Sequence, residues 1–486
     1  MLNDETLAKY DMTVGIECHV QLATNTKLFS GADNDERDKS PNSVVSPIDF
    51  GLPGMLPVLN RGAVDLAIKA GKALNSPIAH ISRFDRKHYF YPDLPKGYQT
   101  TQMYQPIIGA GVINIPLEDG DSVDVRIHHA HMEEDAGKLT HYGNFSLVDL
   151  NRAGTPLIEI VSEPDIHSAV AAKAYATELY HLMTYAGVTR GDLYHGNMRF
   201  DVNVSSALKG STELGTRSEV KNLNSFRSVE RAAEYEFRRQ VELLERGEKV
   251  IQETRGWDDA RQKTSSQRSK EDAQDYRYMP DADIPPIVLS DDEIDRIQAT
   301  VPALPPFYRD AWKGLGLDST VINALISSQS TAQLLQRILE KAGESAARRV
   351  GIWLLMSIDG NLDGEKSSKN NHVPISDDQF IDLSKMVESN ELSSTAAKDV
   401  LFEMMLRPED PRTIALEKNL IQESNADAIM SIVDEVLGDV SSAKAVADLK
   451  NGNDKVIGFL VGQVMKKSGG KANPTLVQEL IRKSII

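Results

Sequence analysis

The stretch Val-Gly-Ile-Glu-Cys-His-Val-Gln-Leu, residues 14–22, decides how the first part of the chain folds. Apolar and polar side chains alternate strictly along it, which is the period of a half-buried β-strand. Glu17 and His19 lie two positions apart on the polar face, so both can address a single ligand. The alternative is a strand whose polar face simply meets solvent, and this stretch alone does not choose between the two.

A second stretch, His131-Met-Glu-Glu-Asp-Ala-Gly-Lys138, places three carboxylates side by side. Adjacent like charges raise one another's pKa unless a cation lies among them. One interpretation is a solvated acidic turn, because charged side chains are mostly exposed. The other is a site for a divalent cation such as Mg²⁺, which collects carboxylate oxygens. Glu159 favours the second, since it interrupts the apolar run 157–161 and an ionised carboxylate there needs a partner.

The remaining patterns predict an α+β chain in three parts. Alternation predicts further strands at 123–127, 157–161, 199–204 and 219–225, and helical periodicity predicts helices at 61–74, 168–186 and 229–246. We expect a mostly antiparallel, sheet-rich first domain over residues 1–289, ended by the proline-rich segment 281–286. An all-α helical domain is expected over 290–405 and a small helical tail domain over 412–486, with a break at 406–411.

Composition limits the classes of function. The net charge of −17 argues against general nucleic-acid binding, which needs a basic surface. Residues 455–486 oppose this trend, with six lysine and arginine residues against one glutamate, so they form either a solvated face or a contact for one specific RNA. No signal peptide or membrane span is predicted. The single cysteine, Cys18, fits a reducing cytoplasm and excludes a cysteine-rich zinc site.

Six acidic or imidazole residues from separate segments of the first domain make up the candidate catalytic site: Glu17, His19, Glu133, Glu134, Glu159 and Asp201. Strand faces form a rigid site, which suits the strict octahedral geometry of Mg²⁺. Basic Lys87, Arg199 and Lys221 then suggest phosphate bridged by the metal. The chain has neither a Walker A loop nor a Gly-x-Ser-x-Gly elbow. These patterns predict a metal-dependent enzyme that handles phosphate.

Residues 83–99 interleave aromatic and basic side chains. Such a mixture suits stacking on bases and contacts with phosphates. Buried aromatic residues in a pair of strands would give the same pattern, so both interpretations stay open.

Several long motifs, taken in order, resemble one family. They are the stretches 14–22 and 131–138, Tyr-Phe-Tyr-Pro-Asp-Leu-Pro-Lys-Gly-Tyr-Gln (89–99), Asn-Arg-Ala-Gly-Thr-Pro-Leu-Ile-Glu-Ile-Val-Ser-Glu-Pro-Asp (151–165), Glu-Val-Lys-Asn-Leu-Asn-Ser (219–225), Gln-Glu-Thr-Arg (252–255), the segment 275–286, and the carboxyl-terminal segments 458–466 and 469–474. Nearly end to end, the chain is similar to the B subunit of the aspartyl/glutamyl-tRNA(Asn/Gln) amidotransferases (the GatB family).

The resemblance implies a cradle-shaped catalytic domain, a helical domain, and a tail that recognises the tRNA body, for which Lys466, Lys467 and Lys471 are candidates. It implies a cytoplasmic ligase that uses ATP and Mg²⁺ to phosphorylate the side-chain carboxylate of Glu-tRNA(Gln) or Asp-tRNA(Asn). Ammonia then displaces the phosphate to form the amide. Two partners are implied: the amidase or A subunit, which releases ammonia from glutamine, and a small C subunit.

By position, the resemblance assigns the family's metal-site role to Glu17, His19, Glu134 and Glu159, with Glu133 and Asp201 as further catalytic candidates. Within the acidic triplet it ranks Glu134 first as a ligand. Residues expected to contact ATP or substrate, or to line a shielded route for ammonia, are Arg86, Lys87, Tyr89, Tyr91, Lys96, Arg199, Lys221, Asn222 and Asn224.

One departure from the family concerns zinc. Many members carry a four-cysteine zinc knuckle, whose matching positions here are Ser30, Ala32, Ser46 and Asp49. We therefore expect no zinc, and a loop 28–52 held by other packing. Two other classes of function stay open: a tRNA-binding scaffold with a decayed catalytic centre, and an unrelated metal-dependent phosphohydrolase that acts without aminoacyl-tRNA.

Overall fold

The computed structural model describes residues 3–269, 276–359, 375–407, 409–422, 426–469 and 471–485. Asp275 and Gly470, which belong to two of the motifs above, lie outside this range. The chain divides into two compact units, Met1–Phe307 and Tyr308–Ile486.

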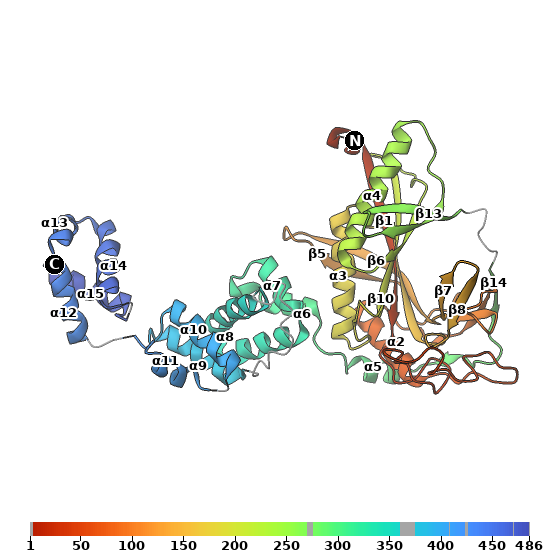
Figure 1. Cartoon of the computed structure of the whole chain (residues 1–486), viewed down its shortest axis with the longest axis horizontal. Helices are drawn as coiled ribbons and strands as arrows, with labels where there is room; N and C mark the ends of the chain where they lie inside the picture. Colours follow the sequence, from red (N-terminus) through yellow and green to blue (C-terminus); the bar gives the residue numbers. More distant parts are fainter. Residues whose placement is uncertain are drawn as a thin grey trace. The chain divides into compact units, whose positions relative to one another are not determined.

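An eight-stranded sheet organises the first unit (Figure 1). Its order is β13 (Lys263–Ser269), β12 (Glu253–Asp258), β11 (Ser218–Leu223), β10 (Met198–Leu208), β1 (Tyr10–Gln21), β9 (Pro156–Ser162), β6 (Ser122–Glu134) and β5 (Gly111–Pro116). Neighbouring strands are antiparallel, as predicted, except that β11 and β12 run parallel.

The strict alternation of the 14–22 stretch is confirmed in β1, one of the central strands. Val14, Cys18 and Val20 are completely buried, while Glu17 and His19 on the other face are partly exposed. Three helices pack with the apolar face in one core: α2 (Arg61–Ala73), α3 (Ala169–Tyr185) and α4 (Phe226–Glu245). These three helices lie on the apolar side, and the opposite, polar side, which carries Glu17 and His19, is called the hollow face (Figure 1).

All three predicted helices are present, although α4 begins three residues before the predicted start. Each begins after a polar cap, because Asn60, Ser168 and Ser225 accept hydrogen bonds from the backbone N–H groups of Gly62, Ala171 and Ser228. Gly187 and Gly247, with φ of 68° and 75°, follow α3 and α4 and end them in the left-handed region.

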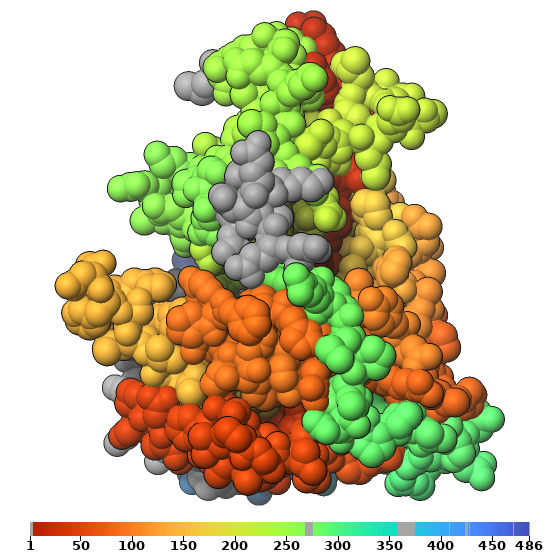
Figure 2. All heavy atoms as spheres, turned by 90° about the vertical axis from the view of Figure 1, so that its right-hand side faces the viewer, coloured from red at the N-terminus to blue at the C-terminus, as the bar shows by residue number. Residues whose placement is uncertain are grey.

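Smaller elements complete the first unit. They are a three-stranded sheet of β14 (Arg277–Pro280), β3 (Asp85–His88) and β4 (Tyr98–Thr101), a pair of β15 (Ile287–Val288) and β2 (Ile81–Ser82), a hairpin of β7 (Lys138–Tyr142) and β8 (Phe145–Asp149), and helices α1 (Asp4–Leu7) and α5 (Asp291–Gln298). In Figure 2 the β7–β8 hairpin, coloured orange-yellow, projects at the left edge of the view. Together with the large sheet, these elements give the unit its α+β character.

Asp49 anchors the loop 28–52 from inside. Its carboxylate accepts hydrogen bonds from Ser30 Oγ (3.0 Å) and from the backbone N–H of Ser46 (2.9 Å). The same carboxylate lies 3.4 Å from Lys27 Nζ, and the Lys27 side chain is completely buried. A buried ion pair with two added hydrogen bonds therefore lies where the family's zinc ligands would be expected.

The second unit is helical throughout its described range. It contains α6 (Pro305–Ala311), which begins in the first unit, and then η2 (Lys313–Leu315), α7 (Ser319–Ile326), α8 (Gln329–Asp359, interrupted at Gly343), α9 (Asp377–Glu388), α10 (Ser394–Leu406), α11 (Pro411–Glu417), α12 (Ala426–Leu437), η3 (Val440–Ser442), α13 (Ala443–Lys450), η4 (Asp454–Val456), α14 (Ile457–Lys467) and α15 (Pro474–Ile485). α11 packs on α9 and α10, whereas α12 to α15 share a core of their own. Among the described helices, none has the length and apolarity needed to cross a membrane.

Candidate functional site

The register of the sheet brings distant residues together on the hollow face. His19 on β1 lies opposite Arg199 on β10 and opposite Glu159 on β9. Glu159 in turn lies opposite His131 on β6. Directly opposed residues of antiparallel strands share a face and lie close to one another, so four neighbouring strands contribute to one site.

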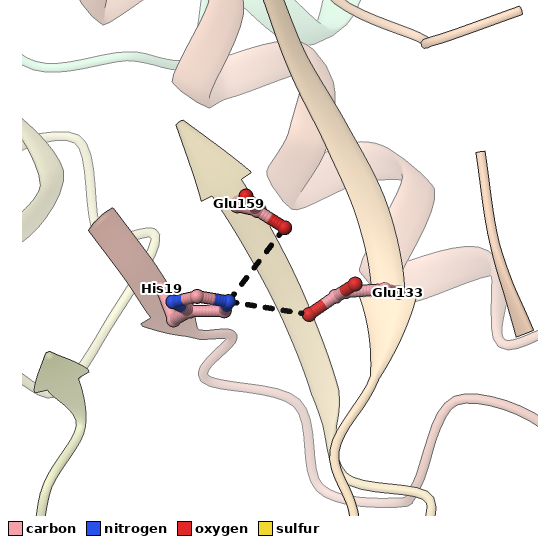
Figure 3. A group of neighbouring side chains, drawn as sticks. All are labelled: His19, Glu133 and Glu159. Atoms are coloured by element: carbon pink, nitrogen blue, oxygen red, sulfur yellow. Dashed lines mark ion pairs between the residues drawn. The ribbon is translucent and has the colours of Figure 1, made fainter. Parts of the chain in front are cut away.

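His19, Glu133 and Glu159 form the tightest part of this site, which we call the primary cluster (Figure 3). His19 Nε2 lies 3.5 Å from Glu133 Oε1 and 3.6 Å from Glu159 Oε2. One ligand atom from each residue falls within 4.8 Å of the others. Two carboxylates and an imidazole at this separation fit Mg²⁺, which takes one or two protein carboxylates and completes its octahedron with water and substrate phosphate.

His131 adds a second imidazole beside the primary cluster. Its Nε2 lies 3.3 Å from Glu159 Oε2 and 3.7 Å from Glu133 Oε2. Burial lowers the pKa of His131, but its hydrogen bonds to the two carboxylates outweigh burial and raise the pKa to about 9. Burial likewise opposes ionisation of Glu159, yet the contact with His131 holds the pKa of Glu159 well below its usual range.

Glu17, Asp201 and Glu219 form a secondary cluster on the same face. Lys221 lies within it, with its Nζ 2.8 Å from Asp201 and 2.9 Å from Glu219. Burial lowers the pKa of Lys221, but the neighbouring Asp201 and Glu219 raise it by more than burial lowers it. The pKa is therefore raised overall and the amine stays charged. Burial and then the charge of Glu159 raise the pKa of Glu17. Because Lys221 already supplies the positive charge here, the primary cluster is the better candidate for a metal ion.

Of the four residues expected to bind metal, His19 and Glu159 lie in the primary cluster, Glu17 lies in the secondary cluster and Glu134 lies in neither. β6 continues through Glu134, so successive side chains point to opposite faces and Glu133, not Glu134, reaches the primary cluster. Glu134 is buried and accepts hydrogen bonds from Lys96 Nζ (2.5 Å) and from the backbone N–H of Thr100 (2.9 Å). The geometry thus reverses the expected order within the acidic triplet. Asp135, the third member, bonds Arg199 at 2.8 Å.

The other basic and aromatic candidates are distributed around the hollow face. Arg86 ties β3 to the segment after β14 through Asp281 (2.8 Å) and Asp283 (2.6 Å). Lys87 lies over the ring of Tyr276, 4.9 Å from its centroid, and Tyr89 packs against the same ring. Burial raises the pKa of Tyr89.

Some predicted residues lie apart from the clusters. Tyr91 is 44% exposed, and Asn222 and Asn224 are exposed on and beyond β11, where Asn222 has a φ of 69°. In the second unit, Lys467 pairs with Glu435 at 2.5 Å, and Lys466 and Lys471 are carried by α14 and the segment after it.

Sequence reasoning did not select His131 and Glu219 for the site. The signal was present, because His129, His131 and Glu133 alternate along β6 in the same way as Glu17 and His19 along β1. The alternation was not recognised because three adjacent carboxylates are typical of a turn, whereas here they lie at the end of a long strand.

Two pockets flank the clusters along β1. The Gly15 pocket, of about 470 Å³, is lined from β1 by Thr13, Gly15, Ile16 and Glu17. The Gln21 pocket, of about 260 Å³, begins at Gln21 and extends to Lys138 and Asp149 of the β7–β8 hairpin. The primary cluster therefore lies between two spaces of a size that accommodates small ligands or parts of them.

Comparison with known proteins agrees with this geometry. The GatB/GatE catalytic domain family matches residues 12–295, and the GatB domain family matches residues 333–485. The chain is 43% identical to the B subunit of the aspartyl/glutamyl-tRNA(Asn/Gln) amidotransferase of Trichodesmium erythraeum, over 98% of both chains. It is 42% identical to the protein of the same name from Persephonella marina, over 98% of this chain and 99% of the relative.

Proposed function

The chain belongs to the family of aspartyl/glutamyl-tRNA(Asn/Gln) amidotransferase B subunits, and we propose that it uses ATP to activate the side-chain carboxylate of Glu-tRNA(Gln) or Asp-tRNA(Asn) for amidation. The observation that carries the proposal is the primary cluster, in which His19, Glu133 and Glu159 converge from three strands of the matched catalytic domain. A bare carboxylate is a poor acyl donor, so a phosphorylated intermediate is the chemical requirement that ATP would meet.

The reaction has two balanced steps. A carboxylate oxygen of the substrate forms a bond to the γ-phosphorus, and the bond from that phosphorus to the β–γ bridging oxygen breaks, which releases ADP. The nitrogen of ammonia then attacks the acyl carbon, the carbon–oxygen bond to phosphate breaks, and inorganic phosphate leaves. The nitrogen loses one proton as the amide forms, and the released phosphate takes this proton up.

The chain's own residues supply binding and charge for these steps. His19, Glu133 and Glu159 would hold Mg²⁺, which supplies charge neutralisation for the phosphoryl group when bound. Arg199 lies opposite His19, and its bond to Asp135 fixes the guanidinium at the side of the primary cluster. Lys87, whose charge acts on Glu159, is the second cation suited to stabilise the transferring phosphoryl group.

The ammonia would come from a complex with two partners, the amidase or A subunit and a small C subunit, since the relatives are named as B subunits of an amidotransferase. Ammonia has to arrive unprotonated, so a shielded path between the partners is required, with Lys96 and its neighbours at its lining. The tRNA body would be bound by the tail through Lys466, Lys467 and Lys471.

The test is a reconstituted assay with both partners. Formation of Gln-tRNA(Gln) and Asn-tRNA(Asn) from the mischarged species is measured with and without ATP and Mg²⁺. We expect an amide in the complete mixture and a loss of about 100-fold or more with Glu159→Gln. Glu118→Gln, which changes a carboxylate that is 75% exposed, serves as the matched control. Absence of amide with either tRNA would overturn the proposal, and ATP-independent amidation would overturn the activation step.

A further inference from the structure

His131 contacts one carboxylate of the primary cluster through a different oxygen from the one that faces His19. Glu133 turns Oε1 toward His19 Nε2 (3.5 Å, Figure 3) and Oε2 toward His131 Nε2 (3.7 Å). Glu159 turns its Oε2 toward both imidazoles, at 3.6 Å from His19 and 3.3 Å from His131. Among the described residues, His19 and not His131 belongs to the group whose ligand atoms all lie within 4.8 Å of one another. His131 is therefore placed to orient the carboxylates from beside the metal ligands.

Hydrogen-bond chemistry determines what His131 Nε2 does at this position. An ionised carboxylate only accepts hydrogen bonds, so Nε2 must carry a hydrogen atom in order to bond Glu133 and Glu159. A donor held there engages Oε2 of Glu133 and leaves Oε1 for a cation on the side of His19. Hydrogen bonds of this kind orient ligating carboxylates, and loss of such a partner typically lowers metal affinity by about 10–100-fold.

Two further imidazoles hold the ring of His131 through its other nitrogen. His131 Nδ1 lies 3.1 Å from His129 Nε2, and the two rings stack with their centroids 5.2 Å apart. His129 Nδ1 in turn lies 2.6 Å from Nδ1 of the exposed His128. Each contact between ring nitrogens needs one donor and one acceptor, so each ring restricts the orientation of the next. These three residues, which we call the imidazole row, connect solvent to the primary cluster.

An irregularity in β6 brings His128 into the imidazole row. Along a regular strand, neighbouring side chains such as those of His128 and His129 point to opposite faces. Here the register between β6 and β9 shifts, because Ile127 pairs with Ser162 whereas His129 pairs with Val161. The extra residue in β6 breaks the alternation, and the rings of His128 and His129 meet with their centroids 4.9 Å apart. Such bulges are frequent next to active sites, where they redirect a side chain.

The secondary cluster is held together in a different way. There Lys221 Nζ lies among the carboxylates, at 2.8 Å from Asp201 and 2.9 Å from Glu219. A lysine in this position takes the place that a metal ion would need. His131 instead reaches the primary cluster from one side, which keeps the oxygen that faces His19 available to a metal ion.

We propose that His131 is a positioning residue of the metal site, held in place by His129 and His128, and that it orients Glu133 and Glu159 toward a cation without binding this cation itself. The inference rests on the proposed function, because it assumes that the primary cluster takes Mg²⁺ in the reaction. The hydrogen bonds from His131 Nε2 then set the affinity of the site for its metal.

Two amide substitutions of His131 separate the roles of its two ring nitrogens. Glutamine places its amide N–H₂ group near the position of Nε2, so His131→Gln keeps a donor for the carboxylates. Asparagine is shorter, so the amide of His131→Asn reaches only the position of Nδ1. Melting curves check that both variants are folded.

The first measurement is the affinity of the full chain for Mn²⁺ alone, followed by EPR spectroscopy. We expect His131→Asn to weaken Mn²⁺ binding by about 10–100-fold and His131→Gln to bind Mn²⁺ nearly as tightly as the wild type. His141→Ala is the matched control, because His141 also makes a ring hydrogen bond, to Ser146 (2.7 Å), but lies on the exposed hairpin. Unchanged affinity in His131→Asn, or equal losses in both amide variants, would overturn the proposal.

Pulsed EPR distinguishes a positioning residue from a metal ligand. An imidazole that binds Mn²⁺ directly gives a nitrogen coupling in the spectrum. We expect this coupling in the wild type and in His131→Gln, and its loss in His19→Ala at saturating Mn²⁺. Loss of the coupling in His131→Gln together with its retention in His19→Ala would overturn the proposal, because His131 would then be the ligand.

His129→Leu tests the rest of the imidazole row. This variant removes the partner of His131 Nδ1 but leaves the contacts of His131 with the carboxylates. We therefore expect Mn²⁺ binding to weaken by a smaller factor than in His131→Asn. An affinity equal to that of the wild type would overturn the part of the proposal that concerns His129 and His128.

Kinetics of the complete three-subunit enzyme provide a further readout. In His131→Asn the Mg²⁺ concentration for half-maximal amidation should rise by the factor measured for Mn²⁺, while the KM for aminoacyl-tRNA stays unchanged. A lower kcat with an unchanged Mg²⁺ requirement is the result of a merely structural role and would overturn the proposal.

Failure of the proposed function is recognised separately. The Mn²⁺ titrations use the chain alone, so they decide the role of His131 even if the wild-type enzyme forms no amide. A wild-type chain that binds no Mn²⁺ would overturn this inference whatever the outcome of the amidation assay.

Discussion

Replacement of Asp49 by alanine should destabilise the first unit through the buried charge that it leaves behind. In the folded chain Lys27 and Asp49 have side-chain exposures of 0% and 3%, and Lys27 Nζ has no hydrogen-bond partner other than this ion-pair contact among the described residues. Removing one member of a buried ion pair typically costs about 3–5 kcal/mol, because the remaining charge is unpaired. Loss of the bonds from Ser30 and Ser46 acts in the same direction.

The measurement is urea unfolding followed by the fluorescence of Trp257, which lies in β12 of the first unit. Trp312 and Trp353 of the second unit are replaced by phenylalanine in every protein, so that the signal reports the first unit alone. We expect Asp49→Ala to lower the free energy of unfolding by about 3–5 kcal/mol.

The double variant Lys27→Met/Asp49→Leu is the matched control. An apolar pair of similar volume replaces a buried ion pair at little or no cost, so most of the lost stability should return. The reasoning is refuted if Asp49→Ala costs less than about 1 kcal/mol, the net value of a single ordinary hydrogen bond, or if the double variant is as unstable as the single one.

Three further predictions concern the same unit. Asp49→Ala should become more stable as the pH rises toward the pKa of lysine in the unfolded chain. Burial lowers the pKa of Lys27 in the folded chain, so the unfolded chain binds more protons between the two pKa values, and loss of Asp49 widens this pH range. Equal dependence of the free energy of unfolding on alkaline pH in Asp49→Ala and wild type would contradict this prediction. His19→Ala should raise the Mg²⁺ concentration needed for half-maximal amidation by about 10–100-fold, and an unchanged Mg²⁺ requirement would remove His19 from the proposed metal site. Glu134→Gln should leave that requirement unchanged but lower the free energy of unfolding by about 1–3 kcal/mol through loss of the contact with Lys96, and a shifted Mg²⁺ requirement would restore Glu134 as a ligand.

Local pattern was sufficient to predict the faces of individual strands. The alternation at 14–22 identified the polar side of β1, and helical periodicity located α2, α3 and α4 to within three residues at each end. Strand faces and helix positions depend on residues that are close in sequence, so the pattern of a single sequence is sufficient to predict them.

Relations between strands were not predictable in the same way. That Glu159 lies opposite both His19 and His131 depends on the register of β9 with two strands far away in sequence. That Glu133 rather than Glu134 reaches the primary cluster depends on where β6 ends. The ends of helices and strands are the positions that a sequence pattern predicts least well. The parallel pairing of β11 with β12 has no local signal at all.

The central place of β1 also has a consequence during synthesis. Both of its neighbours, β9 and β10, follow it by well over a hundred residues. One edge of β1 therefore cannot pair until the ribosome has made β9, and the other cannot pair until it has made β10, which ends at Leu208. At about 5–20 residues per second, the newly made strand waits roughly 10–40 s before both edges can be covered. An unpaired strand edge is a template for aggregation, and the apolar face of β1 is uncovered for the same time, so we expect a chaperone to bind the nascent strand.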